Sequence, residues 1–188
     1  MKTKFIIIFL ILGFVFGYTV YEAVHLDNKF SQSTFSETGS VLKKFPSGVK
    51  FTKIGGEEAV DLSKFVNSED ISIVHFWATW CGPCEIEFPE LVKFIKKNVN
   101  NPRFKFLIIA VQDDKIKVKK FLKKYNVDNI LNSKNVLLLE DYNNDFNKFG
   151  TYKLPETYVF EGLSVLVRKL SGQQDWSNAQ LIEFFSKL

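Results

Sequence analysis

The chain opens with an apolar run unlike anything after it. The stretch from Phe5 to Tyr21 carries no charge, and an apolar helix of about 20 residues, with roughly 17 as the lower limit, spans a bilayer. A cleaved signal peptide would end at a site of the Ala-x-Ala type, but bulky Tyr21 stands two positions before Ala23. The pattern favours an uncleaved signal anchor over residues 1–24, with a cleaved signal peptide or a buried soluble helix as the alternatives.

The charges beside this run predict its orientation. Lys2 and Lys4 precede it, and basic segments stay on the cytoplasmic side of a membrane. We therefore expect a single-pass protein of the cytoplasmic (inner) membrane whose remaining chain lies on the periplasmic, extracytoplasmic side, an oxidising compartment. Residues 25–44 are rich in Ser and Thr without a sustained period, which predicts a linker to a domain over residues 45–188.

Within that domain, strand and helix patterns alternate. Short apolar runs predict strands, and apolar residues at 3.6-residue spacing predict helices. The expected strands form a hairpin over Val49–Leu62 that turns at Gly55 and Gly56, single strands over Ile71–Ala78, Phe104–Val111 and Asn135–Glu140, and an antiparallel hairpin over Glu156–Leu170. The expected helices follow Cys81, cover Asp113–Tyr125, form a short helix over Asp141–Gly150 that Gly150 closes, and end the chain from a capping box at Ser177 and Gln180. This order predicts an α/β fold with a central mixed sheet that helices cover on both faces, preceded by an N-terminal hairpin extension.

Composition narrows the chemistry. The formal net charge of +4 comes largely from dispersed lysines, and no basic stripe is interleaved with aromatic residues, so no nucleic-acid partner is expected. The chain has two Cys and two His, and His25 abuts the apolar run, which disfavours a structural zinc site with four Cys or His ligands. Nothing in the sequence indicates a metal, nucleotide or flavin.

The two cysteines, Cys81 and Cys84, are separated by two residues. A disulfide between them would close a very short loop and would constrain the unfolded chain little, so stability is a weak reason for the pair. With metal binding also disfavoured, the interpretation that remains is a redox-active dithiol.

The position of the pair supports this chemistry. Cys81 stands between a predicted buried strand and a predicted helix, where the helix N-terminus stabilises a thiolate. Gly82 permits a close turn, and Pro83 suits the first helical turn because its missing N–H is not needed there. Cys84 lies one turn deeper and should be buried and protonated. Glu87, three residues further on the same helix face, is within reach of its proton, although it could instead be a surface residue.

The segment "WATWCGPCEIEFPEL" closely resembles the membrane-tethered TlpA/ResA-like thiol–disulfide oxidoreductases of the thioredoxin superfamily, which include the cytochrome c biogenesis thioredoxins. Pro89 stands where a proline kinks the first helix of that family, and Glu87 matches a residue implicated there in proton handling. "YKLPETYVF" resembles the cis-proline segment, which makes Leu154–Pro155 the candidate cis bond. The resemblance covers about Phe45 to Leu188 and implies a thioredoxin-like fold.

The resemblance also implies a mechanism and partners. The Cys81 thiolate would attack a substrate disulfide, and Cys84 would resolve the mixed disulfide, so the Cys81–Cys84 disulfide is the only redox group required. Trp80, Leu154 and Pro155, together with Gly82 and Pro83, would form the wall on which an extended substrate lies. The implied partners are exported proteins with disulfides, with cytochrome c apoproteins as one candidate, and a thiol-reductant donor in the membrane. A disulfide oxidase or isomerase and a non-catalytic binding or redox-sensing module are the competing hypotheses.

His75 departs from the family pattern. It occupies the strand position at which thioredoxins carry a buried Asp and TlpA-like proteins often carry Asn. A buried imidazole tends to stay neutral, although its ordinary pKa lies near the working range. One interpretation is that His75 shares a proton relay with Glu87, and the other is a core histidine satisfied by hydrogen bonds.

Overall fold

The computed structural model describes residues 42–127, 130 and 133–188, and, within the N-terminal segment, residues 13, 15, 17, 18 and 21. Apart from those five residues, the predicted signal anchor over 1–24 lies outside the described residues, as does most of the predicted linker. No helix within the described part of the chain is long and apolar enough to cross a membrane. A compact unit covers Leu42–Leu188. It starts before the predicted boundary at residue 45, because the Lys43 carbonyl accepts a hydrogen bond from the Leu166 N–H at 2.8 Å.

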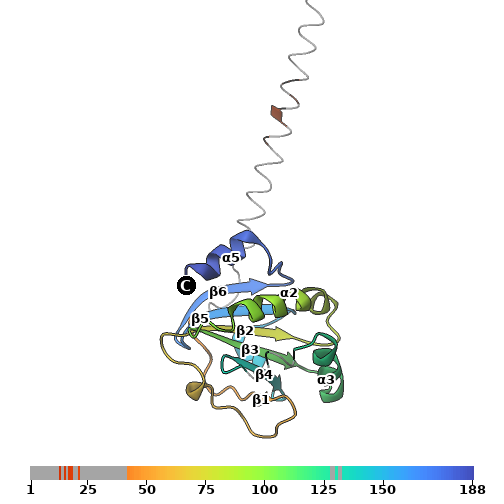
Figure 1. The fold of residues 1–188 in the computed structure, drawn as a ribbon, viewed down its shortest axis with the longest axis vertical. Helices are drawn as coiled ribbons and strands as arrows, with labels where there is room; N and C mark the ends of the chain where they lie inside the picture. Colours follow the sequence, from red (N-terminus) through yellow and green to blue (C-terminus); the bar gives the residue numbers. More distant parts are fainter. Residues whose placement is uncertain are drawn as a thin grey trace, which may run out of the picture. The chain divides into compact units, whose positions relative to one another are not determined.

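A six-stranded sheet forms the centre of this unit, with the strand order β1-β4-β3-β2-β5-β6 (Figure 1). Its strands are β1 (Thr52–Lys53), β2 (Ile71–Trp77), β3 (Phe104–Val111), β4 (Val136–Asp141), β5 (Glu156–Glu161) and β6 (Val165–Ser171). β2, β3 and β4 run parallel, whereas β1, β5 and β6 are antiparallel to their neighbours. The predicted mixed sheet is therefore confirmed, with β2 between β3 and β5.

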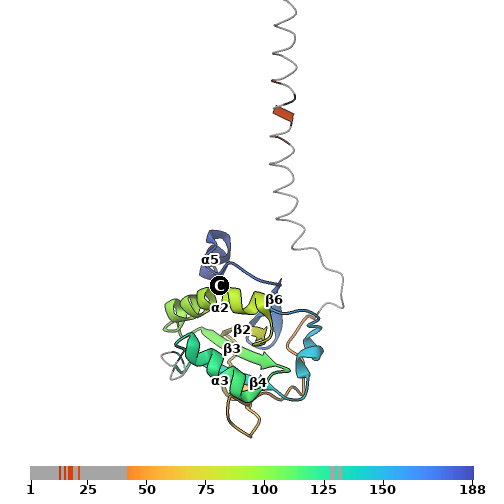
Figure 2. The same ribbon diagram turned by 90° about the vertical axis from the view of Figure 1, so that its right-hand side faces the viewer.

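In the described part of the chain, the α-helices cover one face of the sheet rather than both, which corrects the prediction. One apolar cluster joins this face of the sheet to α2 (Gly82–Asn98), α3 (Lys115–Lys124) and α5 (Ala179–Ser186). Figure 2 shows the same elements from the side. The second apolar cluster contains no residue of these helices. It joins the other face to the segment around Phe51 and to the 3₁₀ helices η1 (Leu62–Lys64) and η2 (Asp145–Phe149).

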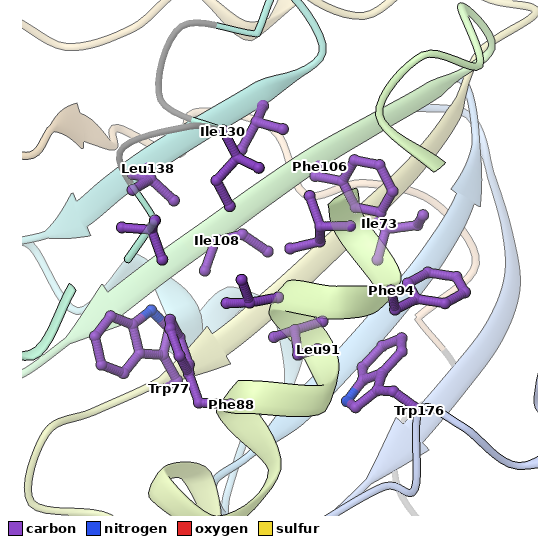
Figure 3. Close-up of a cluster of buried hydrophobic side chains, with 14 of the residues drawn as sticks. Ile73, Trp77, Phe88, Leu91, Phe94, Phe106, Ile108, Ile130, Leu138 and Trp176 are labelled. Carbon is purple, nitrogen blue, oxygen red and sulfur yellow. The ribbon is translucent and has the colours of Figure 1, made fainter. Parts of the chain in front are cut away.

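β2 is buried along its whole length, as its continuous apolar run predicts. Ile73 and Trp77 point into the cluster beneath α2, while Val74 and Phe76 belong to the cluster on the opposite face. The buried face of α2 includes Phe88, whose ring centroid lies 4.9 Å from that of Trp77 (Figure 3). This packing holds the start of α2 at the end of β2, which is where both cysteines lie.

Two local predictions were wrong in detail. The hairpin over Val49–Leu62 keeps only an isolated bridge between Thr52 and Ala59, because β1 pairs instead with β4. The last helix begins not at a Ser177 capping box but at Asn178, whose side chain accepts hydrogen bonds from the N–H groups of Gln180 and Leu181. Asn and Ser cap helices about equally well, so the sequence alone did not separate the two positions.

The turn between β5 and β6 provides a test of the packing. Gly162 has φ +57°, and a Cβ there would lie 3.0 Å from both the Cα and the carbonyl oxygen of Ser68. Gly162→Ala should lower the free energy of unfolding by roughly 2–4 kcal/mol, because the cost of left-handed backbone adds to that of overpacking. Gly48 is a matched control, since its φ is +69° and a Cβ there meets nothing within 4 Å. Gly48→Ala should cost only about 1 kcal/mol. Equal losses in denaturant titrations would contradict the close approach.

Candidate active site

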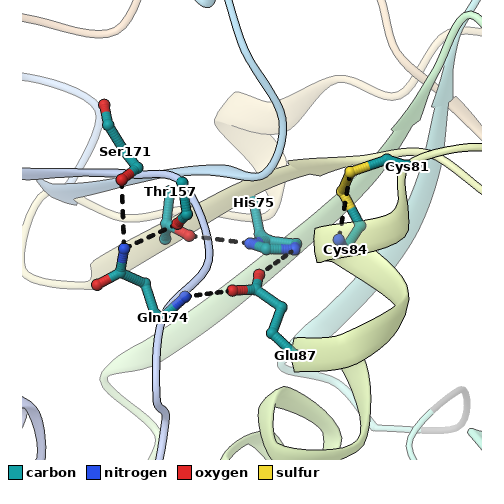
Figure 4. A network of polar contacts seen from close by, with 8 residues as sticks. His75, Cys81, Cys84, Glu87, Thr157, Ser171 and Gln174 are labelled. Carbon is teal, nitrogen blue, oxygen red and sulfur yellow. Dashed lines mark hydrogen bonds and ion pairs between the residues drawn. A yellow bond between two sulfur atoms is a disulfide. The ribbon is translucent and has the colours of Figure 1, made fainter.

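The two cysteines form a disulfide at the junction of β2 and α2 (Figure 4). Their Cα atoms are 5.2 Å apart. Cys81 is the N-cap of α2, and its sulfur accepts a hydrogen bond from the Cys84 N–H at 3.2 Å. Cys81 is 6% exposed and Cys84 fully buried. The helix N-terminus therefore acts on the outer sulfur, and of the two cysteines only Cys81 keeps any exposed surface.

The residues between the cysteines are both exposed. Pro83 lies in the first turn of α2, as predicted. Gly82 is helical and does not have a positive φ, and a Cβ at this position would meet nothing within 4 Å. The close turn that Gly82 permits is therefore not used, and a larger side chain would find open space at this position.

The loop before Cys81 is tied to the end of the neighbouring strand β3. The Trp80 indole, 60% exposed, donates from Nε1 to the Gln112 carbonyl at 2.9 Å. Thr79 donates to the Asp113 carboxylate through its N–H and, at 2.7 Å, through its hydroxyl. Asp113 was missed at the sequence level, although an acidic residue that follows a strand parallel to β2 is a usable signal. These contacts hold Trp80 in an exposed position next to Cys81.

Leu154–Pro155 is a cis peptide bond, as the resemblance implied. It directly precedes β5, and Glu156 of β5 pairs with Phe76 near the end of β2. The cis segment therefore lies at the same end of the central strands as the cysteines. Leu154 packs against the apolar cluster that contains both cysteines.

Glu156, the residue after the cis bond, is fully buried. It accepts hydrogen bonds from the Ser171 hydroxyl at 2.8 Å and the Tyr158 hydroxyl at 2.9 Å, and Lys169 Nζ lies 3.1 Å away. Because a buried carboxylate is stable only when it is paired in this way, these partners fix the start of β5 beneath the cis segment.

Glu87 lies inside the protein and not on its surface. Its side chain is on the buried face of α2, and the residue is 2% exposed. One carboxylate oxygen, Oε2, accepts the Gln174 N–H at 2.6 Å, and the other, Oε1, lies 3.4 Å from His75 Nε2. The other ring nitrogen, His75 Nδ1, is 2.9 Å from the Thr157 hydroxyl. Figure 4 shows this network beside the disulfide.

Burial moves the pKa values of both residues away from their ordinary values. Burial raises the pKa of Glu87 from 4.5 to about 7, and the hydrogen bond from Gln174 and the nearby Trp176 indole oppose this rise only in part. Burial also lowers the pKa of His75 from 6.5 to about 3. A carboxyl group that titrates near neutrality can give or take a proton there, whereas His75 stays neutral.

The structure thus brings together Cys84, Glu87 and His75, which the sequence had suggested. It adds Thr157, Gln174 and Trp176, whose sequence context carried no signal for the site. Among the described residues, no group of three or more His, Cys, Asp or Glu side chains could hold a metal ion.

Comparisons with known proteins agree with this geometry. A family model described as Redoxin matches residues 40–160. The thiol-disulfide oxidoreductase ResA of Bacillus cereus (strain ATCC 10987 / NRS 248) is 28% identical over 189 residues, which cover 97% of this chain and 94% of that protein. ResA of Geobacillus kaustophilus is 30% identical over 141 residues, covering 69% of this chain and 72% of that protein.

Solved structures share the thioredoxin-like fold at low sequence identity. A thiol-disulfide oxidoreductase from Bacteroides fragilis superposes with a TM-score of 0.59 at 19% identity, covering 76% of this chain and 99% of that one. StoA from Bacillus subtilis superposes with a TM-score of 0.54 at 20% identity, covering 72% of this chain and 94% of that one.

Proposed function

The chain belongs to the Redoxin family and is a TlpA/ResA-like thiol–disulfide oxidoreductase of the thioredoxin superfamily, and from this premise we propose that it reduces disulfides of specific exported proteins through Cys81 and Cys84. The observation that carries the proposal is the difference in exposure and surroundings between the two cysteines. Cys81 reaches the surface at the start of α2, while Cys84 is fully buried and lies one helical turn from the buried carboxyl group of Glu87.

The proposed reaction passes two electrons from the dithiol to the substrate. The Cys81 thiolate attacks one sulfur of the substrate disulfide, forms a mixed disulfide, and releases the first substrate thiolate. Cys84 gives its proton to Glu87 and attacks the Cys81 sulfur, so the second substrate thiolate leaves and the Cys81–Cys84 disulfide forms. A proton-accepting group with a pKa near the working pH is the most effective base for such a step, which is why burial of Glu87 matters.

The proposed docking surface surrounds Cys81. Trp80 stands exposed on one side, exposed Gly82 and Pro83 leave access to the sulfur, and Leu154–Pro155 supplies a second wall from the start of β5. An extended segment of the substrate would lie between these walls with its disulfide over Cys81.

The proposed cellular setting follows from the N-terminal sequence. An anchor over residues 1–24 would hold the domain on the extracytoplasmic side of the cytoplasmic membrane, and a membrane thiol donor would re-reduce the disulfide. Cytochrome c apoproteins are one candidate substrate class.

One combined experiment tests the proposal. Cys84→Ser cannot resolve a mixed disulfide, so it should accumulate covalent complexes with a few exported proteins, whereas the matched Cys81→Ser variant should accumulate none. The Cys81–Cys84 reduction potential should lie near that of thioredoxin, about −270 mV. A strongly oxidising value near about −120 mV would indicate an oxidase. An absence of both trapped partners and disulfide-reducing activity would indicate a binding module.

A further inference from the structure

His75 is held between two different polar groups deep in the core. Nδ1 lies 2.9 Å from the Thr157 hydroxyl, and Nε2 lies 3.4 Å from Glu87 Oε1. The second distance is longer than an ordinary hydrogen bond. Within the described part of the chain, however, neither Nε2 nor Oε1 has a hydrogen-bond partner. Each of these buried atoms can therefore satisfy the other, while the Trp176 indole, whose Nε1 is also without a hydrogen-bond partner in this part of the chain, is a second donor near Glu87.

Among the described groups that pack against His75, Glu87 is the one that can change charge while the disulfide is intact. The β3 neighbour of His75 is Ile108 and its β5 neighbour is Thr157, neither of which is titratable. The Trp176 ring packs edge-on, with its centroid 6.1 Å from that of His75. From α2, the titratable groups on this side are Glu87 and Cys84, and Cys84 does not titrate while it is in the disulfide.

A neutral imidazole always has one donor nitrogen and one acceptor nitrogen, and it can exchange them. A threonine hydroxyl can likewise donate or accept. The chain Thr157–His75–Glu87 can therefore be fully hydrogen-bonded in two ways that differ only in direction.

We propose that His75 is a positioning residue for Glu87 that switches tautomer, without becoming charged, each time Glu87 gains or loses a proton. When Glu87 is ionised, His75 Nε2–H donates to Oε1 and the Thr157 hydroxyl donates to Nδ1. When Glu87 is protonated, its O–H donates to Nε2 and Nδ1–H donates to the Thr157 oxygen. The inference rests on the proposed function, since it explains how Glu87 can exchange a proton with Cys84 in a dry interior.

This role explains why an imidazole suits the position. A buried cation at residue 75 would hold Glu87 in its ionised form, and an apolar side chain would leave the carboxylate without its second partner. A neutral group that can both donate and accept stabilises the two protonation states alike, so neither is trapped.

Nitrogen NMR of the full-length chain, labelled with ¹⁵N-histidine and kept in the disulfide form, tests the proposal directly. The chain has two histidines, so the spectrum of His75→Gln assigns the signals. Between pH 5 and pH 9, His75 should stay neutral while its proton moves from Nδ1 to Nε2. The midpoint should match the titration of the Glu87 carboxyl carbon, near pH 7. In Glu87→Gln the tautomer should no longer depend on pH.

Two results would overturn the proposal: formation of an imidazolium at His75 in this range, or a single tautomer that persists while Glu87 titrates. The outcome does not depend on catalysis, because a protein without reductase activity would still show the exchange, and an active reductase with a fixed tautomer would refute this inference alone.

Kinetics of the reduced protein give a second test. His75→Leu should move the alkylation-versus-pH profile of Cys84 to lower pH, since Glu87 without its donor stays neutral over a wider pH range and repels the Cys84 thiolate less. His75→Asn, whose amide can also donate or accept, should restore part of the shift. Circular dichroism confirms that each variant is folded. Coinciding profiles for the natural protein, His75→Leu and His75→Asn would be a result against the proposal.

Discussion

Replacing Cys81 by serine is expected to lower the turnover of disulfide substrates to the uncatalysed rate. Cys81 is the N-cap of α2 and the outer cysteine of the pair, so its sulfur alone combines access to the substrate with stabilisation of its thiolate by the helix N-terminus. A serine hydroxyl remains protonated at neutral pH and cannot replace the thiolate. The measurement is the release of free thiols from a disulfide-bonded protein in the presence of excess reductant.

Cys84→Ser is the matched variant for this experiment. Reduced beforehand and assayed without added reductant, it should retain the first attack, seen as a single burst of one released thiol per enzyme, and then stop at the mixed disulfide. If Cys81→Ser gave the burst and Cys84→Ser did not, the assigned order of the two cysteines would be reversed. Equal residual turnover in both variants would contradict a dithiol mechanism.

Glu87→Gln is expected to raise the free energy of unfolding relative to that of the natural protein. This difference should grow as the pH rises from 4.5 to above 7. The pKa of Glu87 is raised by burial, from 4.5 to about 7, so the folded state binds more protons than the unfolded state between these values. The contribution of Glu87 to stability is therefore complete below pH 4.5 and is lost as the pH rises through 7, by on the order of 3 kcal/mol. Glutamine has the same shape and cannot ionise, so it avoids this loss.

Urea unfolding at pH 5 and pH 8 measures the difference between the two proteins. Glu90→Gln is the control, because Glu90 lies on the same helix, is half-buried and belongs to an exposed pair with Lys93. The effect of Glu90→Gln on the free energy of unfolding should change little between the two pH values. If Glu87→Gln behaved like Glu90→Gln, then burial of Glu87 would not oppose its ionisation.

His75 has the opposite effect on stability. Its pKa is lowered by burial, from 6.5 to about 3, so its contribution is complete above pH 6.5 and is lost as the pH falls through 3. Between pH 4.5 and 6.5 the contributions of His75 and Glu87 largely cancel, which gives a plateau. Stability falls on both sides of this plateau. The fall above pH 6.5 comes from Glu87 and the fall below pH 4.5 comes from His75, so each can be assigned to one residue.

The sequence was most informative where structure depends on neighbours along the chain. The bounds of β3 agree with its apolar run, and the start of α2 agrees with the position of Cys81 and Pro83. The placement of Glu87 on the same helix face as Cys84 needed only the helical repeat. The cis bond at Leu154–Pro155 came from resemblance, because residue propensity does not identify cis bonds.

Partners that are distant in sequence were not predictable in this way. Gln174 donates to Glu87 across 87 residues, and Thr157 meets His75 across 82, so no local pattern connects them. The placing of the helices on one face, α3 included, was not predictable for the same reason. It depends on the packing of Phe121 against Trp77 and Phe88, which is decided only in three dimensions.

The same separations have a consequence for biosynthesis. The disulfide joins residues three apart, whereas the groups that enclose Glu87 and His75 come from β5 and from the segment just before α5. Because chains are made from the N-terminus, both cysteines emerge before these segments exist. A newly made chain therefore carries both cysteines before the buried surroundings of Glu87 and His75 exist. Those surroundings are complete only when the C-terminal part of the chain has packed.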